Sequence, residues 1–216
     1  MNSAALASCV AIASLLAACA NNDRSRDVAN PAVTGTTLAQ QVCSNCHGVT
    51  GNAISPNFPN LAAQTEPYLV AQLSAFKGHA RQDPAGFEYM WGLSRSLTET
   101  QINALAAYYA GQTPARQPLE GAPSQIDAGK AVFENGIPAA NVPACSSCHG
   151  AQAQGVGAMP RLAGQHADYL MKQLAIFQRT DERPDGAVMK VVAHGLTEQN
   201  IGDVSAYLQA MGNQMP

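Results

Sequence analysis

Charged side chains are scarce in this chain of 216 residues. They make up 12% of the sequence, and the formal net charge is −3. Because a protein that binds nucleic acid needs a basic face, this composition excludes a nucleic acid as partner. Apolar residues account for 46%, which indicates a folded core rather than a disordered tail. Lysine is too rare for a dense basic ring that would dock an acidic partner; the lysines are Lys77, Lys130, Lys172 and Lys190.

Apolar runs long enough to span a bilayer are also lacking. The run from Val10 to Ala18 is too short, and small residues follow it. We therefore predict a signal peptide at residues 1–19 and a polar tether at 20–33. Two cleavage patterns fit. In the lipoprotein pattern, which we favour, Cys19 is lipidated and anchors the chain to a membrane, whereas ordinary signal peptidase would cut after Ala20.

Cysteine for a structural disulfide is absent as well. Cys9 and Cys19 lie in the N-terminal apolar stretch, and the remaining cysteines belong to one five-residue pattern that occurs twice. The two copies are Cys43-Ser-Asn-Cys46-His47 and Cys145-Ser-Ser-Cys148-His149, each followed by glycine.

This C-x-x-C-H pattern is typical of covalent attachment of c-type haem. The two thiols add across the two vinyl groups of one porphyrin, and the histidine that follows can bind the iron. A lone C-x-x-C would also fit a redox dithiol or half of a zinc site. The adjacent histidine in both copies favours haem, so we predict two covalently bound haem c groups. Cys43, Cys46, Cys145 and Cys148 are the attachment residues, with His47 and His149 as iron ligands.

The surroundings of the two patterns repeat along the chain. Residues 58–64 (Phe-Pro-Asn-Leu-Ala-Ala-Gln) match residues 159–165 (Met-Pro-Arg-Leu-Ala-Gly-Gln), and residues 97–99 match 196–198 as Leu-Thr-Glu. This indicates a duplicated domain. We predict a first domain at 34–113, a proline-rich linker at 114–126 and a second domain at 127–216.

Each half reads as helical, with no convincing strand, so the predicted fold class is all-α. Glycine- and proline-rich loops at 48–60 and 150–161 are predicted to wrap the haem edges, and the second half carries an extra loop at 136–144. The predicted helices are 37–46, 67–76, 98–110, 127–135, 166–178 and 197–211.

The second axial ligand of each iron decides what the protein does. Methionine opposite histidine favours electron transfer, whereas an open position favours turnover of a small ligand. Met90 and Met189 are the only methionines that match one another, each seven residues before Leu-Thr-Glu, so we predict them as the sixth ligands. His79 is a rival in the first half, and core packing is the ordinary role of a single methionine.

Two further groups have open interpretations. Pro59 and Pro160 follow the haem histidines by similar intervals, so their loops either supply a carbonyl acceptor for the histidine ring or only shape a turn. Arg81, Arg161 and Arg183 suit haem propionates, although we expect surface positions for them.

The residues also carry a family resemblance. Two tandem class I cytochrome c domains, the segment Pro160-Arg161-Leu162-Ala163-Gly164-Gln165-His166 and the residues Val142-Pro143-Ala144 before the second pattern resemble cytochrome c4. The resemblance covers nearly all of the chain after the tether.

This resemblance implies a dihaem periplasmic electron carrier whose two domains are related by a pseudo-twofold axis. It implies His47 with Met90 and His149 with Met189 as ligand pairs, and transfer from a quinol–cytochrome c oxidoreductase or a dehydrogenase towards a terminal oxidase. Two alternatives remain open at this point. One is a dihaem redox enzyme, of the peroxidase or thiosulfate-oxidising type, and the other is a fixed cytochrome subunit of a larger complex.

Overall fold

The computed structural model describes residues 25–119 and 121–213. The predicted signal peptide, the Cys19 lipidation site and the first residues of the predicted tether lie outside this range. Within it, the chain forms helices and loops; the only β-type pairings there are two isolated bridges, between Ile137 and Val142 and between Val156 and Met159. The all-α prediction is confirmed. No helix in the described part is long and apolar enough to cross a membrane.

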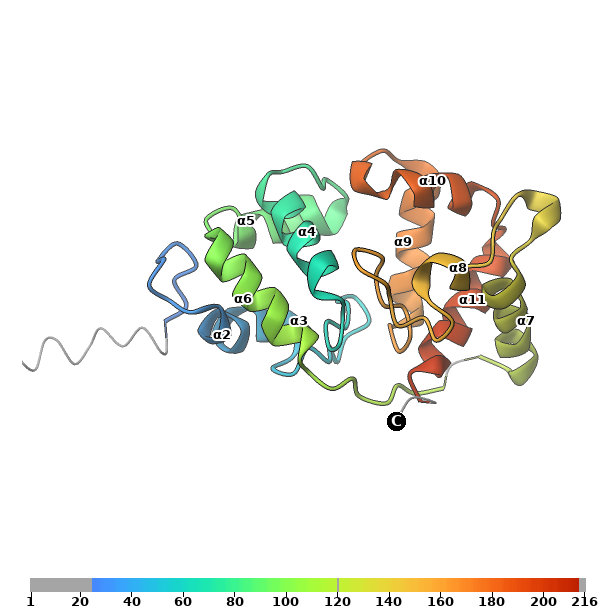
Figure 1. The fold of residues 1–216 in the computed structure, drawn as a ribbon, viewed down its shortest axis with the longest axis horizontal. Helices are drawn as coiled ribbons and strands as arrows, with labels where there is room; N and C mark the ends of the chain where they lie inside the picture. The colour runs from blue at the N-terminus through green and yellow to red at the C-terminus, as the bar shows by residue number, and fades with distance from the viewer. Residues whose placement is uncertain (1–24, 120, 214–216) are drawn as a thin grey trace, which may run out of the picture.

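The helices form two lobes that lie side by side, and the connection between α6 and α7 runs along one edge of both (Figure 1). In the first lobe the elements are α2 (Gly35–Leu38), η2 (Ala39–Cys43), α3 (Ser44–His47), α4 (Glu66–Lys77), η3 (Gly86–Met90), α5 (Trp91–Ser94) and α6 (Glu99–Ala110). In the second they are α7 (Pro123–Asn135), η4 (Pro138–Ala140), α8 (Ser146–His149), α9 (Ala167–Arg179), η5 (Pro184–Gly186), α10 (Ala187–His194) and α11 (Glu198–Met211).

Each lobe has its own hydrophobic core. The first core includes Leu38, Leu105 and Tyr109, and the second includes Phe133 and Leu208. Part of the predicted tether packs on the first lobe: Val33 is buried in its core, and Val28 packs against that core.

The first and last helices of each lobe cross where a glycine allows close approach. A Cβ added at Gly129 of α7 would stand 2.0 Å from the carbonyl oxygen of Asp203 in α11. In the first lobe, a Cβ at Gly35 of α2 would stand 2.5 Å from Cβ of Ala104 in α6. These crossings fix the haem-binding segment of each lobe relative to its last helix.

Capping boxes begin the last helix of each lobe. The Thr98 hydroxyl accepts from the Gln101 backbone N–H at the start of α6, and the Gln101 side chain accepts from the Thr98 N–H in return. Thr197 and Asn200 make the same exchange at the start of α11. Each box satisfies backbone N–H groups that the helix leaves unpaired, so the sequence position of the box sets where the helix begins.

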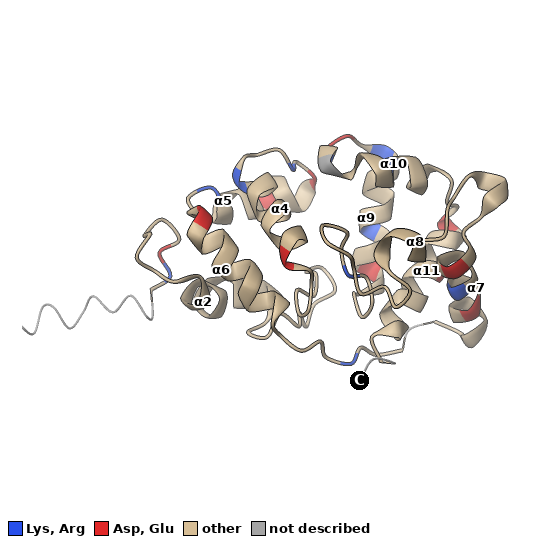
Figure 2. Cartoon of the chain, viewed as in Figure 1, with Lys and Arg blue, Asp and Glu red and all other residues tan. Residues whose placement is uncertain are grey.

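Charged residues are few and spread over both lobes, as Figure 2 shows. The Lys130–Glu134 pair lies one helical turn apart on the exposed side of α7, with nitrogen and oxygen 4.0 Å apart. Solvent screens such a pair, so it contributes little to stability. The ion pair that joins Arg81 to Asp83 is buried instead.

Candidate haem sites

Each C-x-x-C-H pattern spans one short helix and the residue before it. Cys43 directly precedes α3 and Cys145 directly precedes α8, so the two cysteines of a pair lie about one helical turn apart on the same side. Both helices end at a glycine with positive φ, 73° at Gly48 and 83° at Gly150. At Gly48 a Cβ would stand 2.4 Å from the Asn52 carbonyl oxygen, so the sharp exit from the pattern requires glycine.

The first thiol of each pattern lacks the lowered pKa of a reactive redox dithiol. Burial raises the pKa of Cys43 and of Cys145 to about 11, whereas a reactive C-x-x-C motif needs a lowered thiol pKa. Across the residues that the structure describes, no three His, Cys, Asp or Glu side chains are grouped to hold a metal ion. Within the described residues, neither cysteine pair therefore has the further ligands that a zinc site needs.

Both histidines of the patterns are buried and hydrogen-bonded through Nδ1. His47 Nδ1 lies 3.0 Å from the Pro59 carbonyl oxygen, and His149 Nδ1 lies 2.9 Å from the Pro160 carbonyl oxygen. Of the two roles considered for these proline loops, supply of a carbonyl acceptor is the one that the structure shows.

This hydrogen bond determines which ring nitrogen can bind a metal. Desolvation lowers the pKa of His47 and of His149, which favours the neutral ring. A carbonyl oxygen only accepts, so Nδ1 carries the proton and the lone pair stays on Nε2. Both histidines are therefore prepared, as neutral Nδ1–H tautomers, to bind iron through Nε2.

The matched methionines lie on short helices that come after the haem patterns in the sequence. Met90 is the last residue of η3 and Met189 lies within α10, and both are half-buried. Apolar side chains three residues before and after Met90 stay exposed, Phe87 by 64% and Leu93 by 41%. A flat apolar porphyrin would cover such a face, so the residues present fit haem.

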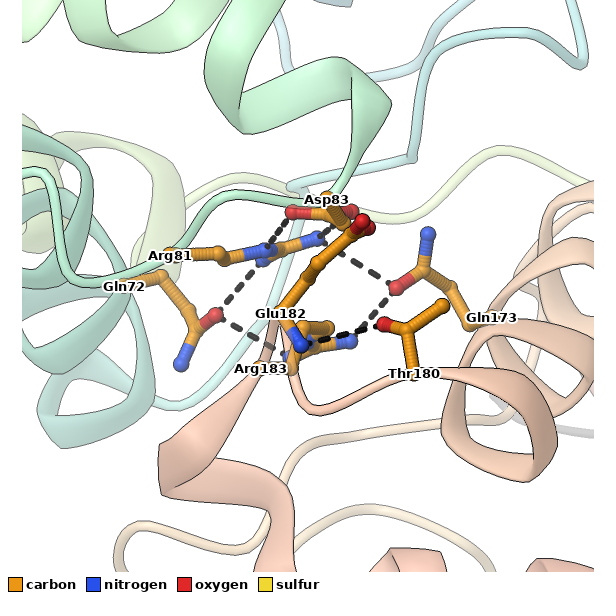
Figure 3. A network of polar contacts seen from close by, with 7 residues as sticks. All are labelled: Gln72, Arg81, Asp83, Gln173, Thr180, Glu182 and Arg183. Carbon is orange, nitrogen blue, oxygen red and sulfur yellow. Dashed lines mark hydrogen bonds and ion pairs between the residues drawn. The ribbon is translucent and has the colours of Figure 1, made fainter.

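The arginines at the boundary between the lobes are buried, not on the surface as expected. Arg81 forms an ion pair with Asp83 at 2.8 Å and donates to Oε1 of Gln72 at 2.6 Å and of Gln173 at 3.3 Å (Figure 3). Arg183 donates to the same two oxygens, at 2.5 Å for Gln173 and 3.1 Å for Gln72. Two guanidinium groups thus share two glutamine oxygens across the boundary. This sharing was not predictable from the sequence, because each arginine takes one of its two acceptors from the other lobe.

Arg161 is buried too, and its backbone joins the lobes. Gln64 of the first lobe accepts from the Arg161 N–H at 2.6 Å and donates to the Arg161 carbonyl oxygen at 3.0 Å. Gln165 of the second lobe does the same with Asn60, at 2.8 Å and 2.9 Å. The two exchanges are equivalent, because Gln64 and Gln165, and likewise Asn60 and Arg161, occupy the same positions of the repeat. Both glutamines recur in the sequence repeat, and that recurrence was the available signal for their role.

The remaining histidines have separate surroundings. His166 is buried, and its Nε2 lies 3.0 Å from the Ala53 carbonyl oxygen of the other lobe. His194 is exposed and bonds the Lys190 carbonyl oxygen. The ring of His79, the rival ligand, contacts that of Trp91 at a tilt, with ring centroids 4.9 Å apart.

Comparisons with known proteins agree with this geometry. The family model described as cytochrome c matches residues 32–111 and 126–212. Cytochrome c-552 of Acidithiobacillus ferridurans is 38% identical over 170 residues, which cover 78% of this chain and 73% of that protein. The solved cytochrome c4 of Acidithiobacillus ferrooxidans has a TM-score of 0.72 at 39% identity, covering 78% of this chain and 97% of its own. The thiosulfate dehydrogenase electron acceptor of Thiomonas intermedia (strain K12) is 33% identical over 175 residues, covering 78% and 77%.

Two helical lobes, each with a C-x-x-C-H helix and a histidine held by a proline carbonyl, define a c-type cytochrome with two haem domains. Its relatives named cytochrome c4 are electron-transfer proteins rather than enzymes. The chain belongs to the cytochrome c4 family and carries two covalently bound haem c groups.

Proposed function

We propose that this dihaem electron carrier binds one iron through His47 and Met90 and the other through His149 and Met189. Cys43 with Cys46, and Cys145 with Cys148, hold the two haems covalently. The observation that supports the histidine half of this proposal is the paired hydrogen bond from Nδ1 to a proline-loop carbonyl, which leaves Nε2 as the metal-binding nitrogen in both lobes.

Two ligands per iron, one histidine and one methionine, suit electron transfer. The haem supplies the redox change, with a potential raised by the methionine sulfur. The protein positions the ligands, excludes water and keeps both lobes in one arrangement. The buried contacts between the lobes support this last role, because they fix the two domains relative to each other without relying on the linker.

An absorption spectrum of the oxidised holoprotein tests the methionine ligands. Methionine sulfur on ferric haem gives a weak absorption band at the red end of the spectrum. We expect Met90→Ala and Met189→Ala each to remove the part of this band that comes from one iron. The matched control is Met171→Ala, because Met171 packs beside the second core on α9. If both ligand variants kept the full band, the axial assignment would be wrong.

We further propose that the carrier works in the periplasm, where it accepts electrons from a quinol–cytochrome c oxidoreductase or a dehydrogenase and passes them towards a terminal oxidase. The predicted N-terminal signal peptide supports export, and cleavage before Cys19 with lipidation of that residue would hold the carrier at a membrane. Mass spectrometry of the mature N-terminus tests both. An N-terminal lipidated Cys19 supports anchoring, and an unmodified terminus after Ala20 contradicts it.

A dehydrogenase as the electron donor is supported by similarity to a protein that is named for this role. The relative from Thiomonas intermedia is named a thiosulfate dehydrogenase electron acceptor. The corresponding second candidate function is acceptance of electrons from a thiosulfate-oxidising enzyme. Stopped-flow reduction of the oxidised carrier by such an enzyme tests it. Reduction by thiosulfate alone, without the enzyme, would instead support the redox-enzyme alternative.

A further inference from the structure

One peptide group of the second lobe takes part in two hydrogen bonds that point in opposite directions. Its carbonyl, that of Pro160, accepts from His149 Nδ1 at 2.9 Å. Its N–H, that of Arg161, donates to Oε1 of Gln64 at 2.6 Å. Since Gln64 belongs to the first lobe, the haem histidine of one lobe is connected through a single peptide group to a side chain of the other.

The first lobe contains the same arrangement with the roles exchanged. The Pro59 carbonyl accepts from His47 Nδ1 at 3.0 Å, and the N–H of the same peptide group, on Asn60, donates to Oε1 of Gln165 at 2.8 Å. Gln64 and Gln165 are 5% and 6% exposed, so little water competes for either bond.

Hydrogen bonds in such a chain strengthen one another. When the N–H of a peptide group donates, its carbonyl oxygen becomes a better acceptor, and the effect is larger in a buried site than in water. A better acceptor at Nδ1–H draws the proton away from the ring and makes Nε2 a stronger donor to a metal. A stronger donor stabilises ferric over ferrous iron, so it lowers the reduction potential.

We propose that Gln64 and Gln165 are crossed positioning residues: each sets the ligand strength of the haem histidine in the opposite domain. Gln64 acts on His149 through the Pro160–Arg161 peptide group, and Gln165 acts on His47 through the Pro59–Asn60 peptide group. The inference rests on the proposed ligation of iron by these two histidines.

A glutamine that served only to hold the lobes together would have a different signature. Its loss would weaken the interface and disturb both haem surroundings alike, because the interface is shared. The crossed arrangement instead requires that loss of Gln64 act on the second haem and loss of Gln165 on the first. The difference lies in which haem responds.

The test uses the complete dihaem protein with Gln64→Leu or Gln165→Leu. Leucine removes all the hydrogen bonds of the amide at similar size: the two to the other lobe and the one that Oε1 accepts from the N–H of the next residue, Thr65 or His166. It adds no sulfur that might bind iron. Gln101→Leu is the matched control, because Gln101 is a buried glutamine whose amide bonds the Asn30 and Val33 carbonyls within the first lobe. Two quantities are measured: the Nδ1–H proton resonance of each haem histidine in the reduced, diamagnetic state, and the reduction potential of each haem.

We expect Gln64→Leu to move the His149 Nδ1–H resonance upfield and to raise the potential of the second haem, with a smaller or no change at the first. Gln165→Leu should do the reverse, and Gln101→Leu should shift neither. Equal shifts at both haems, a larger shift in the lobe that carries the substitution, or no shift at all would overturn the proposal.

The wild-type spectrum separates this proposal from the one on which it rests. Strongly upfield methyl signals from Met90 and Met189, together with ring signals from iron-bound His47 and His149, establish the axial ligands before any variant is made. Missing signals overturn the proposed ligation itself. If the ligand signals are present but the shifts are not crossed, only the role of the glutamines is refuted.

Discussion

Asp83→Asn removes the carboxylate of the buried cluster between the lobes at almost constant volume. Asp83 is fully buried, and both of its oxygens accept from Arg81, at 2.8 Å and 3.1 Å. Arg183 shares both of the glutamine oxygens that Arg81 uses. The substitution would therefore leave the buried Arg81 guanidinium without its carboxylate partner, beside the buried guanidinium of Arg183.

The expected loss follows from the burial of both partners. Removing one member of a buried ion pair costs about 3–5 kcal/mol, because the other charge is left uncompensated. Asparagine can still accept one hydrogen bond from Arg81, so we expect the lower end, about 3 kcal/mol of unfolding free energy. The control is Glu134→Gln, which breaks the exposed Lys130–Glu134 pair and should cost about 0.3–0.5 kcal/mol.

Urea unfolding of the holoprotein measures this difference. Trp91 is the only tryptophan of the chain and lies in the first lobe beside Met90, so its fluorescence reports when that lobe opens and the haem ceases to quench it. We expect a lower midpoint at an unchanged slope, as for a change in stability alone. A loss below about 1 kcal/mol, within the range of exposed pairs, would refute the idea that the carboxylate compensates a buried charge.

Three further predictions concern single residues. Gly129→Ala should lower the unfolding free energy by about 2 kcal/mol in calorimetry, because the added Cβ would stand 2.0 Å from the Asp203 carbonyl oxygen. This clash outweighs the better helix propensity of alanine. Unchanged stability would mean that α7 and α11 can move apart. Burial raises the pKa of Tyr109, so the neutral phenol contributes fully to the unfolding free energy below the unfolded pKa near 10, and this contribution is lost as pH rises above that value. Tyr109→Phe should therefore flatten the fall of the unfolding free energy at alkaline pH. The same slope against pH in the variant and the wild type would contradict this. Thr98→Ala, which breaks the capping box at α6, should cost about 1 kcal/mol in urea unfolding, and a cost near zero would show that Gln101 alone holds the helix start.

The helices with apolar spacing and capping residues were predictable from the sequence. The expected helix at 98–110 corresponds to α6 (Glu99–Ala110), and the capping box at Thr98 is confirmed. The expected helix at 166–178 corresponds to α9 (Ala167–Arg179), where Leu170 lies in the second core and Leu174 packs against that core. In these elements the local preference for helix agrees with the face that is buried, so the apolar spacing alone is enough to predict the helix.

The segments around the predicted ligands were not predictable in the same way. The expected continuous helix at 37–46 contains a π-helical stretch, Ala39–Cys43, directly before the first haem pattern, and η3 (Gly86–Met90) is π-helical up to Met90. A π-helical turn accommodates an extra residue and has no sequence signature of its own. Such turns are held by tertiary packing, which a pattern search does not include.

The contacts between the lobes were beyond reach for another reason. The repeat revealed which residues recur, but not that Gln72 and Gln173 meet Arg81 and Arg183 across the boundary. These contacts join positions about a hundred residues apart, and their polar residues read as ordinary surface residues. These residues are buried only because the two lobes dock over them, and the sequence pattern does not contain that docking.

Gln64 hydrogen-bonds to Arg161, and Gln165 hydrogen-bonds to Asn60 in the same way. Each lobe therefore has a surface that complements a copy of itself. Surfaces of this isologous kind are typical of homodimers with twofold symmetry. In a homodimer the association would depend on protein concentration. Here a covalent connection replaces it with an effective local concentration of about millimolar, as short linkers provide. The chain therefore keeps the symmetry of a dimer at any dilution, and it is free to diverge at each equivalent position.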